Sequence, residues 1–121
     1  MPAISEIHLA IDCVDVDAQA EFWSACLGYP PFASAGQYRT FRPPEGTTGG
    51  IKLVLQQVPE QPSGAKNRVH IDLICGEGFL EEVERIEALG ATRASEVIRE
   101  FGTAWVVMRD PEGNEFCVCE T

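Results

Sequence analysis

Hydrophobic and polar positions alternate over residues 4–14, which is the pattern of a strand that buries one of its two faces. Residues 18–27 instead space their apolar side chains three or four apart, and this spacing predicts an amphipathic helix. Asp15 precedes the helix as a candidate N-cap, and Gly28 follows it as a C-terminal stop. The first part of the chain is therefore predicted to be a strand followed by a helix.

The rest of the first half is predicted to be mostly extended. Residues 29–35 carry two prolines and are interpreted as a connection, whereas residues 37–42 and 49–58 have the composition of strands. The turn-rich sequence PPEGTTGG separates these two strands. Residues 59–67, which contain proline and glycine, predict a linker to the second half.

The second half repeats the order of elements found in the first. A strand over residues 69–75 leads to a helix over 79–89, which ends near Gly90. One short strand is predicted within residues 92–100, and two more, 103–108 and 115–119, flank the turn RDPEGN. The predicted apolar stripe of the helix consists of Phe79, Val83, Ile86 and either Ala88 or Leu89.

Matching positions recur at a constant interval in the two halves. The interval from His8 to His70 equals that from Gly28 to Gly90, and FRPPEG in the first half resembles MRDPEG in the second. This internal repeat predicts a duplicated βαβββ module in an α+β fold. We expect one domain, in which module 1 covers about residues 1–58, a linker about 59–67 and module 2 about 68–121.

Composition narrows the class of protein. The chain has 121 residues and a formal net charge of −10, with only nine Lys and Arg residues, so it lacks the basic face that nucleic acid requires. No apolar run approaches the roughly 18 residues of a membrane span, and the N-terminal residues do not resemble a signal peptide. The five cysteines lie within predicted strands and a helix and suit reduced thiols in the cytoplasm.

Several motifs together resemble the vicinal oxygen chelate superfamily, which includes glyoxalases, bleomycin resistance proteins and extradiol dioxygenases. They are the strand and helix that end in LG, the second strand HIDL, the helix end ALGA, and DPEGNEF near the C-terminus. The resemblance covers nearly the whole chain. It implies two βαβββ modules that form a curled mixed sheet around a shared cleft, with the helices outside, and often a homodimer.

The resemblance also implies a divalent metal in the cleft, such as Zn, Ni, Mn or Fe. His8 and His70 match the histidine ligands that the first strand of each module contributes. The family's glutamate ligand is expected seven residues after Asp110, but that residue is Cys117 here. Glu115 lies on the same strand face and is the candidate replacement, since side chains alternate along a strand. The implied metal ligands are therefore His8, His70 and Glu115.

Further residues are candidates for binding a small molecule in the cleft. Asp12 and Asp72 share strand faces with the two histidines, although a hydrogen bond to a loop explains each of them as well. Cys117 could be a soft metal ligand, a nucleophile or a small buried hydrophobe. The predicted ligand-binding set is His8, Asp12, Gln56, His70, Asp72, Trp105 and Cys117.

Three functions follow as hypotheses. The missing glutamate favours a glyoxalase or bleomycin resistance-like protein that binds a small molecule in the cleft between its modules, with no assigned activity. The alternative is a divalent-metal-dependent isomerase, lyase or dioxygenase of the same superfamily, in which the metal would hold neighbouring oxygens of the substrate. The third is a regulatory module that acts through a dimer surface, because fold alone does not determine function.

Overall fold

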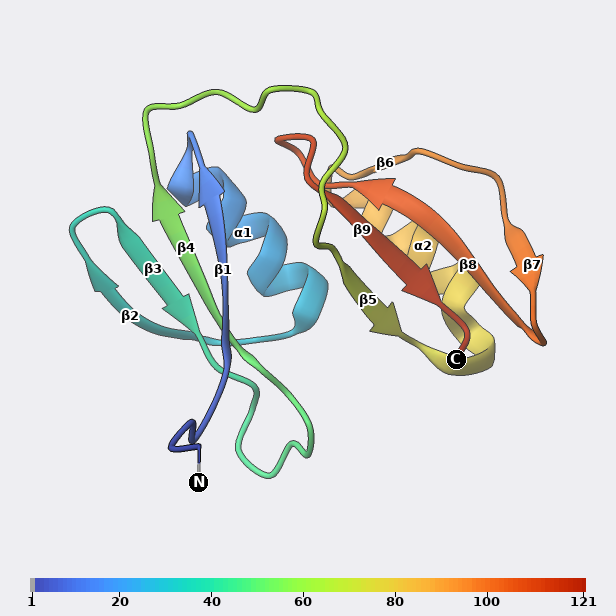
Figure 1. Cartoon of the computed structure of the whole chain (residues 1–121), viewed down its shortest axis with the longest axis horizontal. Coiled ribbons are helices and arrows are strands. Elements are labelled where there is room, and N and C mark those ends of the chain that lie inside the picture. Colours follow the sequence, from blue (N-terminus) through green and yellow to red (C-terminus); the bar gives the residue numbers. More distant parts are fainter. Residues whose placement is uncertain (1) are drawn as a thin grey trace. The chain divides into compact units, whose positions relative to one another are not determined.

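The chain folds into two compact units, Met1–Gln61 and Pro62–Thr121, in this computed structural model, which describes residues 2–121 (Figure 1). Each unit contains one sheet and one helix, and apolar residues of the helix are buried in each. The α+β class predicted from the sequence is confirmed. The units are described separately below.

The first unit has a four-stranded sheet in the order β1-β4-β3-β2. β1 pairs with β4 in parallel, and the other two pairings are antiparallel. Its elements are β1 (His8–Cys13), α1 (Val16–Leu27), β2 (Pro31–Ala35), β3 (Tyr38–Phe41) and β4 (Lys52–Gln57).

Local sequence explains where α1 begins and ends. The Asp15 carboxylate accepts a hydrogen bond from the Ala18 amide at 3.1 Å, so it caps one of the free amides of the first turn. Gly28 ends the helix at a φ of 68°, a left-handed conformation that glycine adopts without steric cost. Phe22 and Trp23 pack edge to face with ring centroids 5.2 Å apart, and both are buried.

The second unit has a five-stranded sheet in the order β5-β9-β8-β6, with β7 also paired to β8. β5 pairs with β9 in parallel, as β1 pairs with β4 in the first unit. Both units thus run in the order strand, helix and further strands, but in the second unit two short strands, β6 and β7, stand in place of one and both pair with β8. The elements are β5 (Ile71–Ile74), the 3₁₀ turn η1 (Gly76–Gly78), α2 (Phe79–Ala88), β6 (Thr92–Arg93), β7 (Ile98–Glu100), β8 (Thr103–Arg109) and β9 (Glu115–Cys119).

The core of the second unit lies between α2 and one face of its sheet. On β8, buried residues alternate with half-buried ones; on β9, Phe116 and Val118 are almost fully buried, and Cys117 and Cys119 on the other face are 6% exposed. This alternation divides the sheet into a helix-covered face and an open face. The buried core residues are Phe79, Val83 and Ile86 of α2 with Ala104, Val106, Met108, Phe116 and Val118 of the strands.

Two predictions of extended structure need correction. Residues 29–35, interpreted as a connection, contain the edge strand β2, because proline is tolerated at the first position of an edge strand. The single strand predicted within 92–100 is two strands, β6 and β7. Between them the Ser95 hydroxyl accepts a hydrogen bond from the Val107 amide at 3.0 Å, so a side chain replaces a backbone partner there.

Leu89 also differs from its predicted place on the buried stripe of α2. It is the C-cap residue and is 38% exposed, whereas Ile86 is 1% exposed. Leu89 therefore lies at the end of the helix and does not belong to its buried stripe.

We expect Ile86→Ala to lower the free energy of unfolding by about 2 to 5 kcal/mol, because it removes buried methyl groups and leaves a cavity. The matched variant Leu89→Ala should cost less than about 1 kcal/mol, since its side chain is partly in water already. Urea denaturation followed by tryptophan fluorescence in a Trp23→Phe background, where Trp105 is the remaining tryptophan, measures both. Equal losses in the two variants would contradict the assigned helix face.

Candidate functional site

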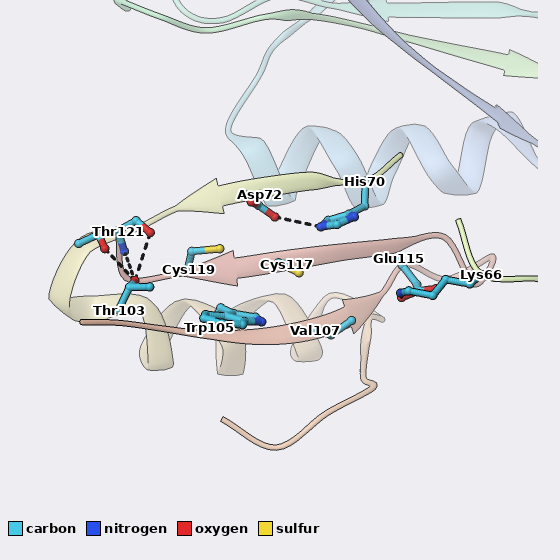
Figure 2. Close-up of a pocket in the computed structure, with 10 residues that line it drawn as sticks. All are labelled: Lys66, His70, Asp72, Thr103, Trp105, Val107, Glu115, Cys117, Cys119 and Thr121. Carbon is cyan, nitrogen blue, oxygen red and sulfur yellow. Dashed lines mark hydrogen bonds and ion pairs between the residues drawn. The ribbon is translucent and has the colours of Figure 1, made fainter. Parts of the chain in front are cut away.

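A pocket of about 440 Å³ opens on the face of the second unit's sheet that α2 leaves uncovered (Figure 2). This volume lies within the usual range for small-molecule sites. All of its lining residues belong to the second unit. They are Lys66, His70, Asp72, Thr103, Trp105, Val107, Glu115, Cys117, Cys119 and Thr121.

Strand register explains why residues from distant parts of the sequence meet in this pocket. Asp72 on β5 lies opposite Cys117 on β9, and Cys117 lies opposite Val107 on β8. Trp105 is likewise opposite Cys119. Because side chains alternate along each strand, these neighbours all point to the open face.

His70, Asp72 and Cys117 form the polar centre of the pocket. One potential metal-binding atom of each lies within 4.8 Å of those of the other two. His70 Nε2 and Asp72 Oδ1 are 3.4 Å apart, as the dashed line in Figure 2 indicates. Imidazole, carboxylate and thiolate are together a donor set that suits Zn²⁺ and similar borderline cations.

The two thiols of the pocket are poor nucleophiles. Burial raises the pKa of Cys117 to about 11, and the nearby Asp72 carboxylate adds to the shift. Burial also raises the pKa of Cys119 to about 11, again with a contribution from Asp72. Both thiols are therefore protonated at neutral pH, which disfavours the reading of Cys117 as a nucleophile.

An ion pair marks one end of the pocket. Lys66 Nζ donates a hydrogen bond to Glu115 Oε2 at 2.8 Å, and this bond is the main cause that lowers the pKa of Glu115. Glu115 is thus ionised and already has a cationic partner. At the other end, the Thr121 hydroxyl lies 2.7 Å from that of Thr103.

The sequence-predicted site residues fall into two groups. His70, Asp72, Trp105, Glu115 and Cys117 line the pocket of the second unit. The other three belong to the first unit, on the same face of its sheet: His8 lies at the start of β1, and Asp12 pairs in register with Gln56. The His8 ring is bonded to the Glu6 carboxylate. Thus five of the eight candidates come together in one pocket.

Sequence reasoning missed several pocket residues. Thr103 and Val107 occupy alternate positions on a predicted strand, so strand periodicity could have identified them. Periodicity does place Cys119 on the same strand face as Glu115 and Cys117, although the predicted ligand-binding set omits it. Lys66 lies in the predicted linker, where no periodic signal exists. Its role becomes visible only from the bond to Glu115.

Taken together, the fold and this pocket define a small α+β protein with a polar, ligand-sized site on an open sheet. The glyoxalase-like domain family matches residues 8–119, and the chain belongs to that family. The superfamily resemblance noted from the sequence motifs is thereby confirmed. No curated protein matches the sequence.

Solved structures with the same fold include proteins of several activities. A glyoxalase/bleomycin resistance protein/dioxygenase family enzyme from Burkholderia phytofirmans has a TM-score of 0.74 and 19% identity, covering 93% of this chain and 94% of its own. A mutant fosfomycin resistance protein FosX from Listeria monocytogenes, complexed with Mn(II) and a dihydroxypropylphosphonic acid, has a TM-score of 0.77 and 16% identity, covering 99% and 91%. FosX from Mesorhizobium loti scores 0.74 at 14% identity, covering 100% and 94%. At these identities the likeness establishes the fold.

Membrane insertion through a helix finds no support in the part of the chain that the structure describes. Neither α1 nor α2 combines the length and the hydropathy that a spanning helix needs.

The raised thiol pKa values predict that stability falls in alkali. Between pH 9 and 11 the folded protein keeps thiol protons that the unfolded chain releases, so the free energy of unfolding should decrease as the pH rises through this window. Urea denaturation at several pH values measures the slope. In a Cys117→Ala, Cys119→Ala double variant the slope should flatten, and an unchanged slope would show that other groups cause it.

Proposed function

We propose that the protein binds a small molecule in the pocket of the second unit. The observation that carries this proposal is the convergence of His70, Asp72 and Cys117 with Trp105 in one ligand-sized cavity. Pockets of this kind typically combine apolar walls with a few polar groups that orient the ligand. The family match supports a small-molecule site but leaves the specific activity unassigned.

The lining of the pocket suggests the kind of ligand. Trp105 and Val107 provide apolar surface on β8, and the indole ring suits a flat ligand group. His70 and Asp72 provide hydrogen-bonding groups on the opposite side, and the hydroxyls of Thr103 and Thr121 lie at one end. We infer an amphipathic ligand with a flat apolar part and at least one hydrogen-bonding group.

Trp105 offers a direct measurement of binding. A library of flat, polar-substituted compounds should contain ligands that quench the Trp105 fluorescence, whereas the buried Trp23 of the first unit should respond little. His70→Ala should weaken binding about tenfold or more, because a buried polar contact of the ligand is lost. The matched control is Arg68→Ala, which changes an exposed residue outside the pocket lining.

Two outcomes would count against this function. A Trp105→Phe variant that shows the same quenching would place the ligand elsewhere. Equal loss of binding in His70→Ala and Arg68→Ala would indicate a general effect of either substitution and not a contact in the pocket.

A divalent cation at His70, Asp72 and Cys117 is the second candidate, and it would make the protein a metal-dependent enzyme of the isomerase, lyase or dioxygenase type. The closeness of the three donor atoms favours it, as does the Mn(II) in one structural neighbour. Three protein ligands would leave a position for substrate oxygen, and the ion would act there as a Lewis acid. Cys117 would have to lose its proton on binding.

Metal titration tests this second candidate. Because a thiolate favours softer ions, Zn²⁺ and Co²⁺ should raise the melting temperature of the reduced protein more than Mn²⁺ does. The Co²⁺ form should absorb in the sulfur-to-metal charge-transfer region, and Cys117→Ser should abolish that band. Cys119→Ser is the matched control. A band that survives Cys117→Ser, or no effect of any ion, would contradict the site.

Other features implied by the resemblance stay predictions. The ligand set His8, His70 and Glu115 is one, and Lys66 would have to release Glu115 for it to form. The single functional domain, the homodimer and the cytoplasmic location are the others. Metal titration of His8→Ala and size-exclusion chromatography would test the ligand set and the homodimer.

A further inference from the structure

The first unit carries a cluster of cations and one aromatic ring at one end of its sheet. Lys52 is the first residue of β4, Arg42 directly follows β3, and Phe32 lies on β2, so three adjacent strands of the sheet contribute to it (Figure 1). We name Phe32, Arg42 and Lys52 the cationic cluster. None of the three lines the pocket of the second unit.

Both cations lie close to the aromatic ring of Phe32. The Arg42 guanidinium carbon lies 3.9 Å from the Phe32 ring centroid, and Lys52 Nζ lies 5.6 Å from the same centroid. The separation of the two charges is therefore at most the sum of these distances, which is about one Debye length or ~10 Å at 0.1 M salt. Cation–π attraction offsets part of the repulsion between them.

A register shift in the sheet presents Phe32 in this position. The pairing of β2 with β3 shifts between Pro31 and Ala33, so Phe32 is the extra residue of a β-bulge. Bulges re-aim side chains, and this one leaves Phe32 55% exposed beneath a guanidinium. An exposed aromatic ring used in this way orients Arg42.

The two cations are free to bind an anion. Among residues 2–121, neither Arg42 nor Lys52 forms an ion pair, although the chain carries nineteen acidic residues. A guanidinium that stacks through its face keeps its N–H donors available at its edge. Arg39 on the neighbouring strand β3 differs, because it is bonded to Asp17 at 3.2 Å.

One carboxylate lies near this cluster. His8 pairs in register with Lys52, and the His8 ring is hydrogen-bonded to the Glu6 carboxylate. The Glu6 carboxylate can therefore compete with an added anion for the two positive charges.

We propose that Arg42 and Lys52, with Phe32 as their aromatic support, form a binding site for an oxyanion group, either a phosphate or a carboxylate, of a small ligand. Arg42 makes bidentate hydrogen bonds to two of its oxygens, and Lys52 supplies a second positive charge. The Glu6 carboxylate competes with the bound oxyanion for the charges of Arg42 and Lys52.

Nuclear magnetic resonance titration of the full chain tests this site. Sodium phosphate and sodium acetate, each added at constant ionic strength, serve as separate probes. We expect saturable shifts of the amides around residues 32, 42 and 52 with at least one probe, and the probe that saturates at lower concentration identifies the anion. No saturable shift with either probe would overturn the proposal.

Variants of the cluster and of its surroundings make the test specific. Arg42→Gln and Lys52→Met should each raise the dissociation constant about tenfold, as expected for loss of a charge-assisted contact. Glu6→Gln should lower it, because the competing carboxylate is gone. The matched control Arg39→Gln removes the same charge from β3 and should change the constant less than twofold. Equal weakening in Arg39→Gln and Arg42→Gln would show only a general charge effect and would overturn the site.

Discussion

The parallel pairing of β5 with β9 is the constraint on which the candidate site depends. It places Asp72 beside Cys117 although the whole of α2, β6, β7 and β8 separates them in the sequence. The turn before β9 supports this register from the other side. There the buried Asp110 carboxylate accepts hydrogen bonds from the amides of Glu112 and Asn114, both at 2.9 Å. Because this turn fixes the start of β9, the register of the strand is fixed as well. A slip of one residue would turn the side chains of Glu115 and Cys117 away from the pocket.

The same closeness that gathers these side chains also limits their chemistry. Burial disfavours the thiolate of Cys117, and the neighbouring Asp72 carboxylate adds to this effect, so the pKa of Cys117 rises to about 11. The group is then inert as a nucleophile but remains a good ligand once a cation compensates the negative charges. Glu115 shows the opposite case, because Lys66 provides its counter-charge within the protein. The pocket thus contains two kinds of group. Lys66 compensates the charge of Glu115, whereas a bound cation would be needed to compensate the donor set His70, Asp72 and Cys117.

Much of the fold was predictable because the local signals agree with the tertiary structure. The bounds of β9 and the N-cap Asp15 follow directly from alternation and capping chemistry. Alternation also placed His70 and Asp72 on one face, which the pocket confirms. Other features depend on contacts distant in sequence. Lys66 becomes a pocket residue only through Glu115, and the break between β6 and β7 depends on the Ser95 bond to β8. Nor could periodicity show that Leu89 falls beyond the last buried turn of α2.

The two modules share the parallel pairing of their first and last strands, but the residue opposite the histidine is a cation in one and an anion in the other. In the first unit His8 pairs in register with Lys52. In the second unit the corresponding histidine, His70, directly precedes the pair Ile71 and Phe116, so Glu115 takes the place that Lys52 has in the first. The two modules therefore share the parallel pairing and its histidine, but the residue opposite that histidine differs in the sign of its charge. A surface with unpaired cations attracts oxyanions, whereas one with an imidazole, a carboxylate and a thiol attracts cations or hydrogen-bonding ligands. The last strand of each module thus contributes to a proposed site, through Lys52 in the first module and Cys117 in the second, and the residues gathered around each differ in charge.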